Sequence, residues 1–499
     1  MHNNKLNSIN VSYLNLAAQS PSLELNLALS EKVHRTSPSN THVFFMCDRA
    51  LSSCSVNLLN KKSICDICRY KAKKGYEVFK ERNPNSKLIK LTREDLSDIN
   101  TDKLGKDNID EILLGVHSTI GSQLRLDNMN LLNKKWRKIK NKMFNSSVGM
   151  FNYFNLFLKK NKVNNFIIFN GRLSCARPLV KVAKENRVSY KLFDASVNGK
   201  IPMYSTNEMF HSISFEKNNA LKTYVKFFKE SKSIAEEYMF KKRNALETND
   251  FAYTGDQKYG FIEKRVQNLA KPIISIFVSS DDEYRFIGSD WAKFGLEDQT
   301  DSITKIINSD LKNNYDFVVK MHPNQKNIHV SIMERYLNLS NDVLVLFPNN
   351  KTDTYALIQK SEIVINFCST VGAEANYLRK PVVQIGASRF RLLPVANYVK
   401  NAIEAINIIK SKEYKVMPLR ASVVYFCYHG KTQFKLDSYK FLEDGVYSYG
   451  GKLIKAKAYM RYYAIFDKLY QSYIRGDRDL FSKLSLYIPN LIFGTNKVR

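Results

Sequence analysis

The stretch Ser361–Gly386 carries residue types that suit anion binding. It reads as a short apolar strand, a polar turn holding Ser369 and Thr370, a helix, and a second apolar strand. A strand that leads into such a turn and a helix start can present backbone N–H groups and two hydroxyls to an anion. Glu374, one turn into the helix, is placed to accept hydrogen bonds from a ribose. The alternative interpretation is an ordinary strand–helix–strand unit whose serine caps the helix.

A second stretch, Asp316–Gln325 (DFVVKMHPNQ), reads as a buried strand that ends in a histidine. Pro323 stops the strand, so His322 is expected at the carboxyl edge of a sheet, where ligands bind in open parallel sheets. Lys320 stands two residues earlier and is expected on the same face as His322. Alternation along the strand makes a structural role for Lys320 an equal alternative.

Together these stretches resemble the nucleotide-sugar half of bacterial GT-B glycosyltransferases of the capsule and lipopolysaccharide type. The resemblance rests on His322-Pro323, on Ser369-Thr370, and on a pattern similar to GxEA…KPVV at residues 372–375 and 380–383. It covers roughly residues 270–390. In that family the HP and S-T motifs hold the donor phosphates. The resemblance thus implies donor binding by Lys320, His322, Asn324, Ser369, Thr370, Gly372 and Glu374.

The first half of the chain holds a looser set of candidates. Asn170-Gly171-Arg172 follows an apolar run, and Asp194 ends the next one. Both features resemble the acceptor half of the same enzymes, although the family more often has Glu-Arg-Gly where this chain has Asp194-Ala195-Ser196. The resemblance implies an acceptor site at residues 170–172, to which Asp48 at another strand end is added. Asp194 is the first candidate for the base that takes the acceptor proton, with the acids at 281–283 second, and His322 is the other catalytic candidate.

Four cysteines lie within residues 47–68, after the second predicted strand. Only the last two show the C-x2-C spacing of metal ligands, and no second pair follows. A structural zinc site is therefore the weaker interpretation, and partly buried small side chains the stronger one. The four cysteines are Cys47, Cys54, Cys65 and Cys68. No acidic pair sits where a metal-dependent transferase would need it, so we expect neither a catalytic metal nor a cofactor.

Composition limits the class of protein. The 499 residues carry 77 basic and 47 acidic side chains, a formal net charge of +30. This excess indicates an acidic partner: phosphorylated substrates, nucleic acid or an anionic membrane surface. The basic residues are spread along the chain and no nucleic-acid module is recognisable, so we expect no nucleic-acid partner. Seven cysteines, no signal-peptide pattern and no apolar run long enough to span a bilayer predict a cytoplasmic protein, with the inner membrane face as an alternative location.

Alternating apolar runs and helical segments predict an α/β fold. We expect two Rossmann-like doubly wound domains facing a central cleft, the GT-B arrangement, with a helical C-terminal extension. The predicted boundaries are 1–262 for the acceptor domain, 263–410 for the nucleotide-sugar domain and 411–499 for helices that pack across the domains or on a membrane. Residues 111–114 are predicted as a strand, followed by a Ser118-Thr119 turn.

The resemblance implies a transferase that moves a sugar from a nucleotide-sugar donor to a hydroxyl of a bacterial surface glycan, free or lipid-linked. CMP-, UDP- and GDP-sugars all stay open, as do retention or inversion and the oligomeric state. One alternative is a UDP-sugar 2-epimerase, which shares the G-x-E-A pattern but would leave the charge of +30 unexplained. Another is a non-catalytic polyanion- or membrane-binding protein. A degenerate subunit would be expected to lack the HP or S-T residues.

Overall fold

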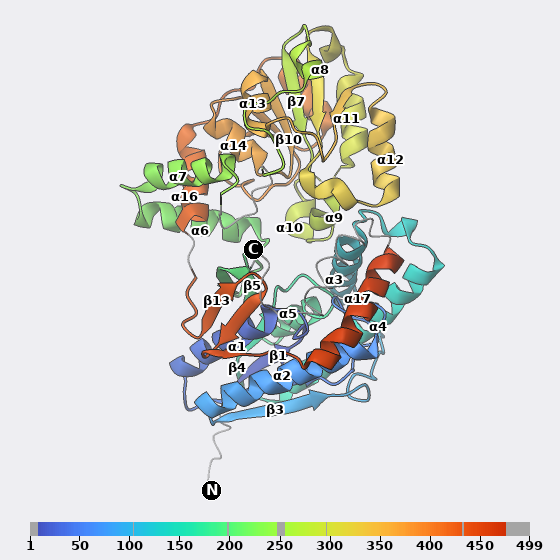
Figure 1. The fold of residues 1–499 in the computed structure, drawn as a ribbon, viewed down its shortest axis with the longest axis vertical. Helices are drawn as coiled ribbons and strands as arrows, with labels where there is room; N and C mark the ends of the chain where they lie inside the picture. Colours follow the sequence, from blue (N-terminus) through green and yellow to red (C-terminus); the bar gives the residue numbers. More distant parts are fainter. Residues whose placement is uncertain are drawn as a thin grey trace. The chain divides into compact units, whose positions relative to one another are not determined.

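The computed structural model describes residues 8–102, 104–196, 199–246, 255–295, 297–431 and 434–475. The chain forms two compact units (Figure 1). Unit 1 contains residues 1–124, 128–210 and 433–499, and unit 2 contains residues 125–127 and 211–432. Each unit has its own sheet and its own core.

Unit 1 is built on a six-stranded sheet with the order β3-β2-β1-β4-β5-β6. Its strands are β1 (Ile9–Leu14), β2 (Thr41–Cys47), β3 (Ser86–Leu91), β4 (Val163–Phe169), β5 (Ser189–Ala195) and β6 (Pro202–Thr206). All neighbours pair in parallel except β6, which is antiparallel to β5. The strand order reverses between β1 and β4, which is where such sheets leave a crevice for ligands at their carboxyl edge.

Helices cover both faces of this sheet, which explains why its strands β1 and β2 are buried over almost their whole length. They are α1 (Ser22–Thr36), α2 (Lys62–Arg82), α3 (Lys106–Leu124), α4 (Lys134–Lys160) and α5 (Arg177–Glu185), with the short 3-10 helix η1 (Met129–Leu131). Helices α3, α4 and α5 pack against one another, and α1 packs against α2. The last part of the chain adds a small antiparallel sheet and one helix: β13 (Tyr439–Glu443), β14 (Val446–Tyr449), β15 (Lys452–Leu453) and α17 (Ala458–Arg475).

Unit 2 has a fully parallel six-stranded sheet with the order β12-β11-β10-β7-β8-β9. Its strands are β7 (Ile273–Phe277), β8 (Asp316–Lys320), β9 (Leu344–Leu346), β10 (Ile363–Phe367), β11 (Val382–Ile385) and β12 (Asn397–Val399). The order reverses between β7 and β10. The central strands are buried throughout, so the two faces of the sheet give two apolar cores.

The helices of unit 2 form two groups. Those that follow strands are α9 (Asp281–Tyr284), α10 (Ser289–Ala292), α11 (Gln299–Ile307), α12 (Val330–Leu339), α13 (Thr354–Lys360), α14 (Val371–Tyr377) and α15 (Ala402–Lys410), with the 3-10 helices η3 (Asp310–Asn313) and η4 (Pro323–Asn327). The others are α6 (Ile213–Lys226), α7 (Ser231–Arg243), α8 (Lys264–Gln267) and α16 (Leu419–Lys431). Helix α16 lies beside α6 and α7 (Figure 1), and the buried His429 Nε2 contacts Glu216 Oε1 at 2.7 Å.

The predicted fold class of two Rossmann-like α/β sheets is confirmed, but several local predictions are wrong. Residues 111–114 lie inside α3, because their apolar side chains continue the helical face of that segment. Strand β3 was not predicted, since its lysines break the apolar run. The segment after residue 410 is not wholly helical, as it includes β13, β14 and β15.

The division of the chain also differs from the predicted one. The first crossing lies at Phe210 rather than 262, because α6 and α7 pack against α16 of unit 2. The chain returns to unit 1 near residue 433, where α17 packs on α2. Among the helices of the described segments, none combines the length and the apolar character that crossing a bilayer requires.

Candidate functional site

A cavity in unit 2 lies at the carboxyl edge of the sheet, where the strand order reverses. Residues that follow β7, β8 and β10 line it, and helices α7, α13 and α14 add the remaining walls. Its volume is about 60 Å³. That space holds roughly four or five waters, so it suits a compact polar group such as a phosphate. The polar residues that line it are Lys242, Gln257, Lys320, His322, Thr354, Tyr355, Ser369, Thr370 and Glu374.

Two local features of the chain end the strands at this edge. Pro323 cannot donate to the sheet, so β8 ends and the short helix η4 begins. After β10, Cys368 adopts a positive φ of 51°, which turns the chain sharply toward Ser369 and Thr370. The Cys368 thiol donates to the backbone oxygen of Ala387 at 3.0 Å, which holds this turn.

The imidazole of His322 has a defined tautomer. Its Nδ1 accepts a hydrogen bond from the backbone N–H of Asn324 at 3.1 Å, so a neutral ring carries its proton on Nε2. Burial, with Lys242, Arg125 and Lys320 nearby, lowers the pKa of His322 to about 3. The residue is therefore a neutral hydrogen-bond donor at physiological pH, not a cation.

Positive charge at the cavity comes from two buried lysines. Lys320 donates from Nζ to the backbone oxygen of Thr352 at 2.9 Å, and burial lowers its pKa to about 8. Lys242, from the last turn of α7, places Nζ 4.0 Å from Glu374 Oε1. Glu374 offsets one of these two charges, so the lining keeps a net positive charge, which favours a negatively charged ligand.

Glu374 is held by protein groups in this structure. Its Oε1 accepts from the Thr370 hydroxyl at 3.0 Å, and the Tyr355 hydroxyl is also hydrogen-bonded to the carboxylate. Burial and this carboxylate raise the pKa of Tyr355. The side chain lines the cavity as predicted. The assignment of Glu374 to a ribose stays a prediction.

The start of α14 differs from what the sequence suggested. The N–H of Val371 donates to Ser369 Oγ at 3.3 Å, and the next three N–H groups donate to backbone oxygens of Ser369 and Thr370. The expectation of unpaired N–H groups is therefore wrong for residues 371–374, because the tight turn satisfies them locally. Gly372 does not line the cavity. Its α-carbon is closely packed, because a Cβ added there would lie 2.9 Å from Asn366 Nδ2 and from Phe390 Cζ. Its glycine is explained by this close packing.

Asn324 also stands outside the cavity lining. Its side chain donates to Glu283 Oε1 at 2.8 Å, and its backbone oxygen accepts from Arg125 Nη2 at 2.8 Å. Arg125 in turn lies 3.0 Å from Asp282 Oδ2. The acids at 282 and 283 are thus held in a charged network, whereas the sequence alone made them candidates for the base.

Asp281, the third of these acids, has a different environment. The side-chain amide of Gln299 donates to its carboxylate, and burial with Asp127 and Asp298 nearby raises its pKa to about 7. It lines a separate small cavity that includes Arg285 and Gly386.

Two of the acceptor-site residues predicted in unit 1, Asn170 and Asp194, are in contact. The side-chain amide of Asn170 donates to Asp194, and the backbone N–H of Ala195 donates to the same carboxylate at 2.8 Å. Burial raises the pKa of Asp194, while these bonds and the nearby Arg172 oppose that rise. Asn170 and Gly171 have φ values of 52° and 85°, and this left-handed turn brings the amide to Asp194.

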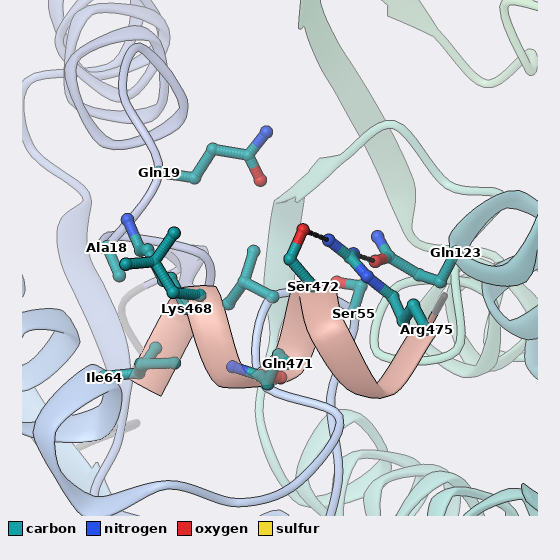
Figure 2. Close-up of a pocket in the computed structure, with 11 residues that line it drawn as sticks. Ala18, Gln19, Ser55, Ile64, Gln123, Lys468, Gln471, Ser472 and Arg475 are labelled. Carbon is teal, nitrogen blue, oxygen red and sulfur yellow. Dashed lines mark hydrogen bonds between the residues drawn. The ribbon is translucent and has the colours of Figure 1, made fainter. Parts of the chain in front are cut away.

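Unit 1 also contains two cavities lined in part by α17. One, of about 240 Å³, includes Gln123, Lys468 and Arg475. In Figure 2, Arg475 donates to the Gln123 side chain, at 2.5 Å, and to Ser472 Oγ, at 3.4 Å. The other, of about 990 Å³, includes Asp48. Asp48 is thus separated from the Asn170 and Asp194 pair and is bonded to Arg69 at 2.5 Å.

The zinc alternative gains no support. Within the described ranges, no group of three or more His, Cys, Asp or Glu side chains is arranged to hold a metal ion. The four cysteines in question lie in those ranges and are all free thiols.

No family model and no curated protein match the chain. Among solved structures, the chain is similar to the Thermosulfurimonas dismutans KpsC beta Kdo 2,4 transferase, with 15% identity over 55% of this chain and 85% of that chain and a TM-score of 0.35. It is also similar to a UDP-GlcNAc 2-epimerase from Neisseria meningitidis bound to UDP-GlcNAc, with 10% identity, 85% and 95% coverage and a TM-score of 0.24. The wall teichoic acid polymerase TagF is similar with 10% identity over 85% of this chain and 84% of that chain, and with a TM-score of 0.22.

Sequence reasoning missed Lys242 and Tyr355. Lys242 belongs to a basic run at the end of α7, which reads as a solvated surface. Only its tertiary packing against Glu374 shows that it is buried. Nothing in the neighbouring sequence indicates that this lysine, rather than the others in the helix, is buried.

Proposed function

We propose that the chain is a glycosyltransferase that moves a sugar from a nucleotide-sugar donor to a hydroxyl of a bacterial surface glycan. The observation that carries this proposal is the cavity at the reversal of strand order in unit 2. It combines Lys242, Lys320 and the neutral His322 with the hydroxyls of Ser369 and Thr370. Preformed positive charge and hydrogen-bond donors of this kind suit a phosphate on which charge develops.

In this proposal unit 2 binds the donor. The two lysines and the Nε2–H of His322 stabilise the negative charge that grows on the departing nucleotide phosphate as its bond to the sugar breaks. Because protein groups supply this charge, the proposal assigns no catalytic metal. The assignments of Asn324 and Glu374 to the donor remain expectations from the family resemblance, whereas we assign Gly372 to packing against Asn366 and Phe390.

Asp194 of unit 1 is the proposed base, with Asn170, Gly171 and Arg172 at the acceptor. In an inverting reaction, the acceptor oxygen bonds to the sugar carbon while its proton passes to the Asp194 carboxylate. Burial raises the pKa of Asp194 and so brings it nearer to the working pH, which makes the carboxylate a stronger base. The Asn170 amide orients the carboxylate by a hydrogen bond.

The test is nucleotide release from CMP-, UDP- and GDP-sugars, with and without oligosaccharides of surface glycans as acceptors. We expect acceptor-dependent release from one donor class, and a loss of about 10²- to 10⁴-fold in kcat for Asp194→Asn. Asp110→Asn, at an exposed acid on α3, is the matched control and should keep full activity. Release of nucleotide that ignores every acceptor, or epimerisation of a free donor, would contradict the proposal.

A further inference from the structure

The larger cavity of unit 1 plays no part in the proposed donor site. It lies between α2 and α17, which pack side by side (Figure 1), and its volume is about 990 Å³. We call it the α2–α17 groove. A volume of this size is at the upper end of the range for ligand-binding clefts.

One wall of the α2–α17 groove is aromatic. Tyr459, Tyr462, Tyr463 and Phe466 stand at helical spacing on α17 and are 59%, 47%, 63% and 53% exposed. The rings of Tyr462 and Phe466 lie 5.0 Å apart between centroids. Neighbouring exposed rings on one helix face indicate a binding surface rather than scattered surface residues.

The opposite wall of the groove carries an excess of positive charge. Its two acids are already paired, since Arg69 lies 2.5 Å from Asp48 and 3.0 Å from Asp66. The third acid of the groove, Asp467 on α17, lies 3.5 Å from Lys61. Three exposed lysines also line the groove and make no ion pair or hydrogen bond with any residue that the structure describes. They are Lys62, Lys73 and Lys90. The groove is therefore suited to an anionic ligand.

We propose that the α2–α17 groove binds an acidic oligosaccharide. The faces of the tyrosine rings pack against sugar rings, because a tyrosine offers an apolar face and a polar hydroxyl together. The three lysines pair with carboxylate or phosphate groups on the chain, and the paired carboxylates accept hydrogen bonds from sugar hydroxyls. An anionic bilayer fits less well, because the aromatic side chains and the lysines line a groove of about 990 Å³ and not a flat face.

Binding at the groove needs no donor. That the bound glycan is the acceptor rests on the proposed function. The two can fail separately, since one is measured with oligosaccharides alone and the other with nucleotides.

The experiment measures binding of three hexasaccharides to the full chain by titration calorimetry: one from hyaluronan, one of sialic acid, and neutral maltohexaose. We expect at least one acidic chain to bind at least tenfold more tightly than maltohexaose. Tyr463→Ala should weaken that binding at least fivefold, and Lys73→Gln should weaken it while reducing its dependence on salt. The matched controls are Tyr473→Ala, at a tyrosine on α17 that is 66% exposed but outside the groove, and Lys80→Gln on α2.

Several outcomes would overturn the inference. They are equal binding of maltohexaose, equal loss in Tyr463→Ala and Tyr473→Ala, or no binding of any acidic chain. Binding to phosphatidylglycerol vesicles without binding to either acidic hexasaccharide would assign the surface to a membrane instead. Thermal unfolding of each variant, which should match the parent within about 2 °C, guards against a folding defect as the cause.

Discussion

The backbone N–H of Asn324 donates to Nδ1 of His322 at 3.1 Å and thereby fixes the proton of the ring on Nε2. The same contact begins the short helix η4, with the Gln325 side chain accepting in return from the His322 N–H at 2.8 Å. The HP motif is thus a capped turn as well as a part of the cavity wall. The histidine can orient a phosphate by donating a hydrogen bond but cannot neutralise it.

The lowered pKa of His322 predicts how stability depends on pH. The unfolded chain takes up a proton at this residue near pH 6.5, whereas the folded chain does so only near pH 3. Stability from this residue is therefore present above pH 6.5 and falls as the pH drops below it. At pH 5 the loss is about 2 kcal/mol. Urea unfolding of the parent and His322→Gln at pH 7.5 and pH 5 should show a smaller loss in the variant. An equal loss in both would mean that the ring is not held neutral.

Gly372→Ala should lower the stability of the fold and leave nucleotide binding unchanged. The added Cβ would meet Asn366 Nδ2 and Phe390 Cζ at 2.9 Å, so the variant should lose about 1–3 kcal/mol of unfolding free energy. Because Gly372 does not line the cavity, nucleotide affinity at 20 °C should stay within about twofold of the parent. Gly105→Ala is the control, since nothing lies within 4 Å of its added Cβ. A large loss of affinity with unchanged stability would instead assign Gly372 to the donor.

Asp281 predicts the opposite pH dependence to His322. Its pKa is raised from 3.8 to about 7, so the folded chain keeps the proton while the unfolded chain loses it, and stability falls as pH rises from about 4 to about 7. Asp281→Asn removes this cost. Its stability relative to the parent should therefore increase by up to about 3 kcal/mol between pH 5 and pH 8. Asp301→Asn, at an exposed acid on α11, is the matched control for the loss of a carboxylate. A difference from the parent that does not change with pH for Asp281→Asn would place the pKa of Asp281 near its ordinary value.

The sequence was informative where local chemistry determines local structure. Pro323 predicts the end of β8, and the polar residues after Phe367 predict the end of β10. These two strand ends could therefore be placed at the edge of the cavity from the sequence. The burial of Lys242 could not be predicted, because it depends on packing between α7 and α14, which are far apart in sequence. Similarly, Asp281, Asp282 and Glu283 look alike in sequence, yet a glutamine holds one and an arginine the other two.

The long-range division of the chain was harder still. Helices α6 and α7 carry charged faces that give no sign of which sheet they join, and they belong to unit 2 because α16 packs on them. Strand β3 is short and contains two lysines, so its sequence gives only a weak strand pattern. It forms a strand because it pairs with β2 at the edge of the sheet.

The most direct test of the central claim is a thermal-shift measurement with CMP, UDP, GDP, CDP and ADP. A ligand at a hundred times its Kd stabilises the folded chain by about 2.7 kcal/mol. We predict that one nucleotide raises the Tm of the parent, and that Lys320→Met and His322→Ala lose this response. Lys380→Met is the matched control, because its Nζ also donates to a backbone oxygen of unit 2, that of Ser361 at 2.8 Å, but away from the cavity. If no nucleotide shifts the parent, or if Lys380→Met loses the response equally, the cavity is not a donor site.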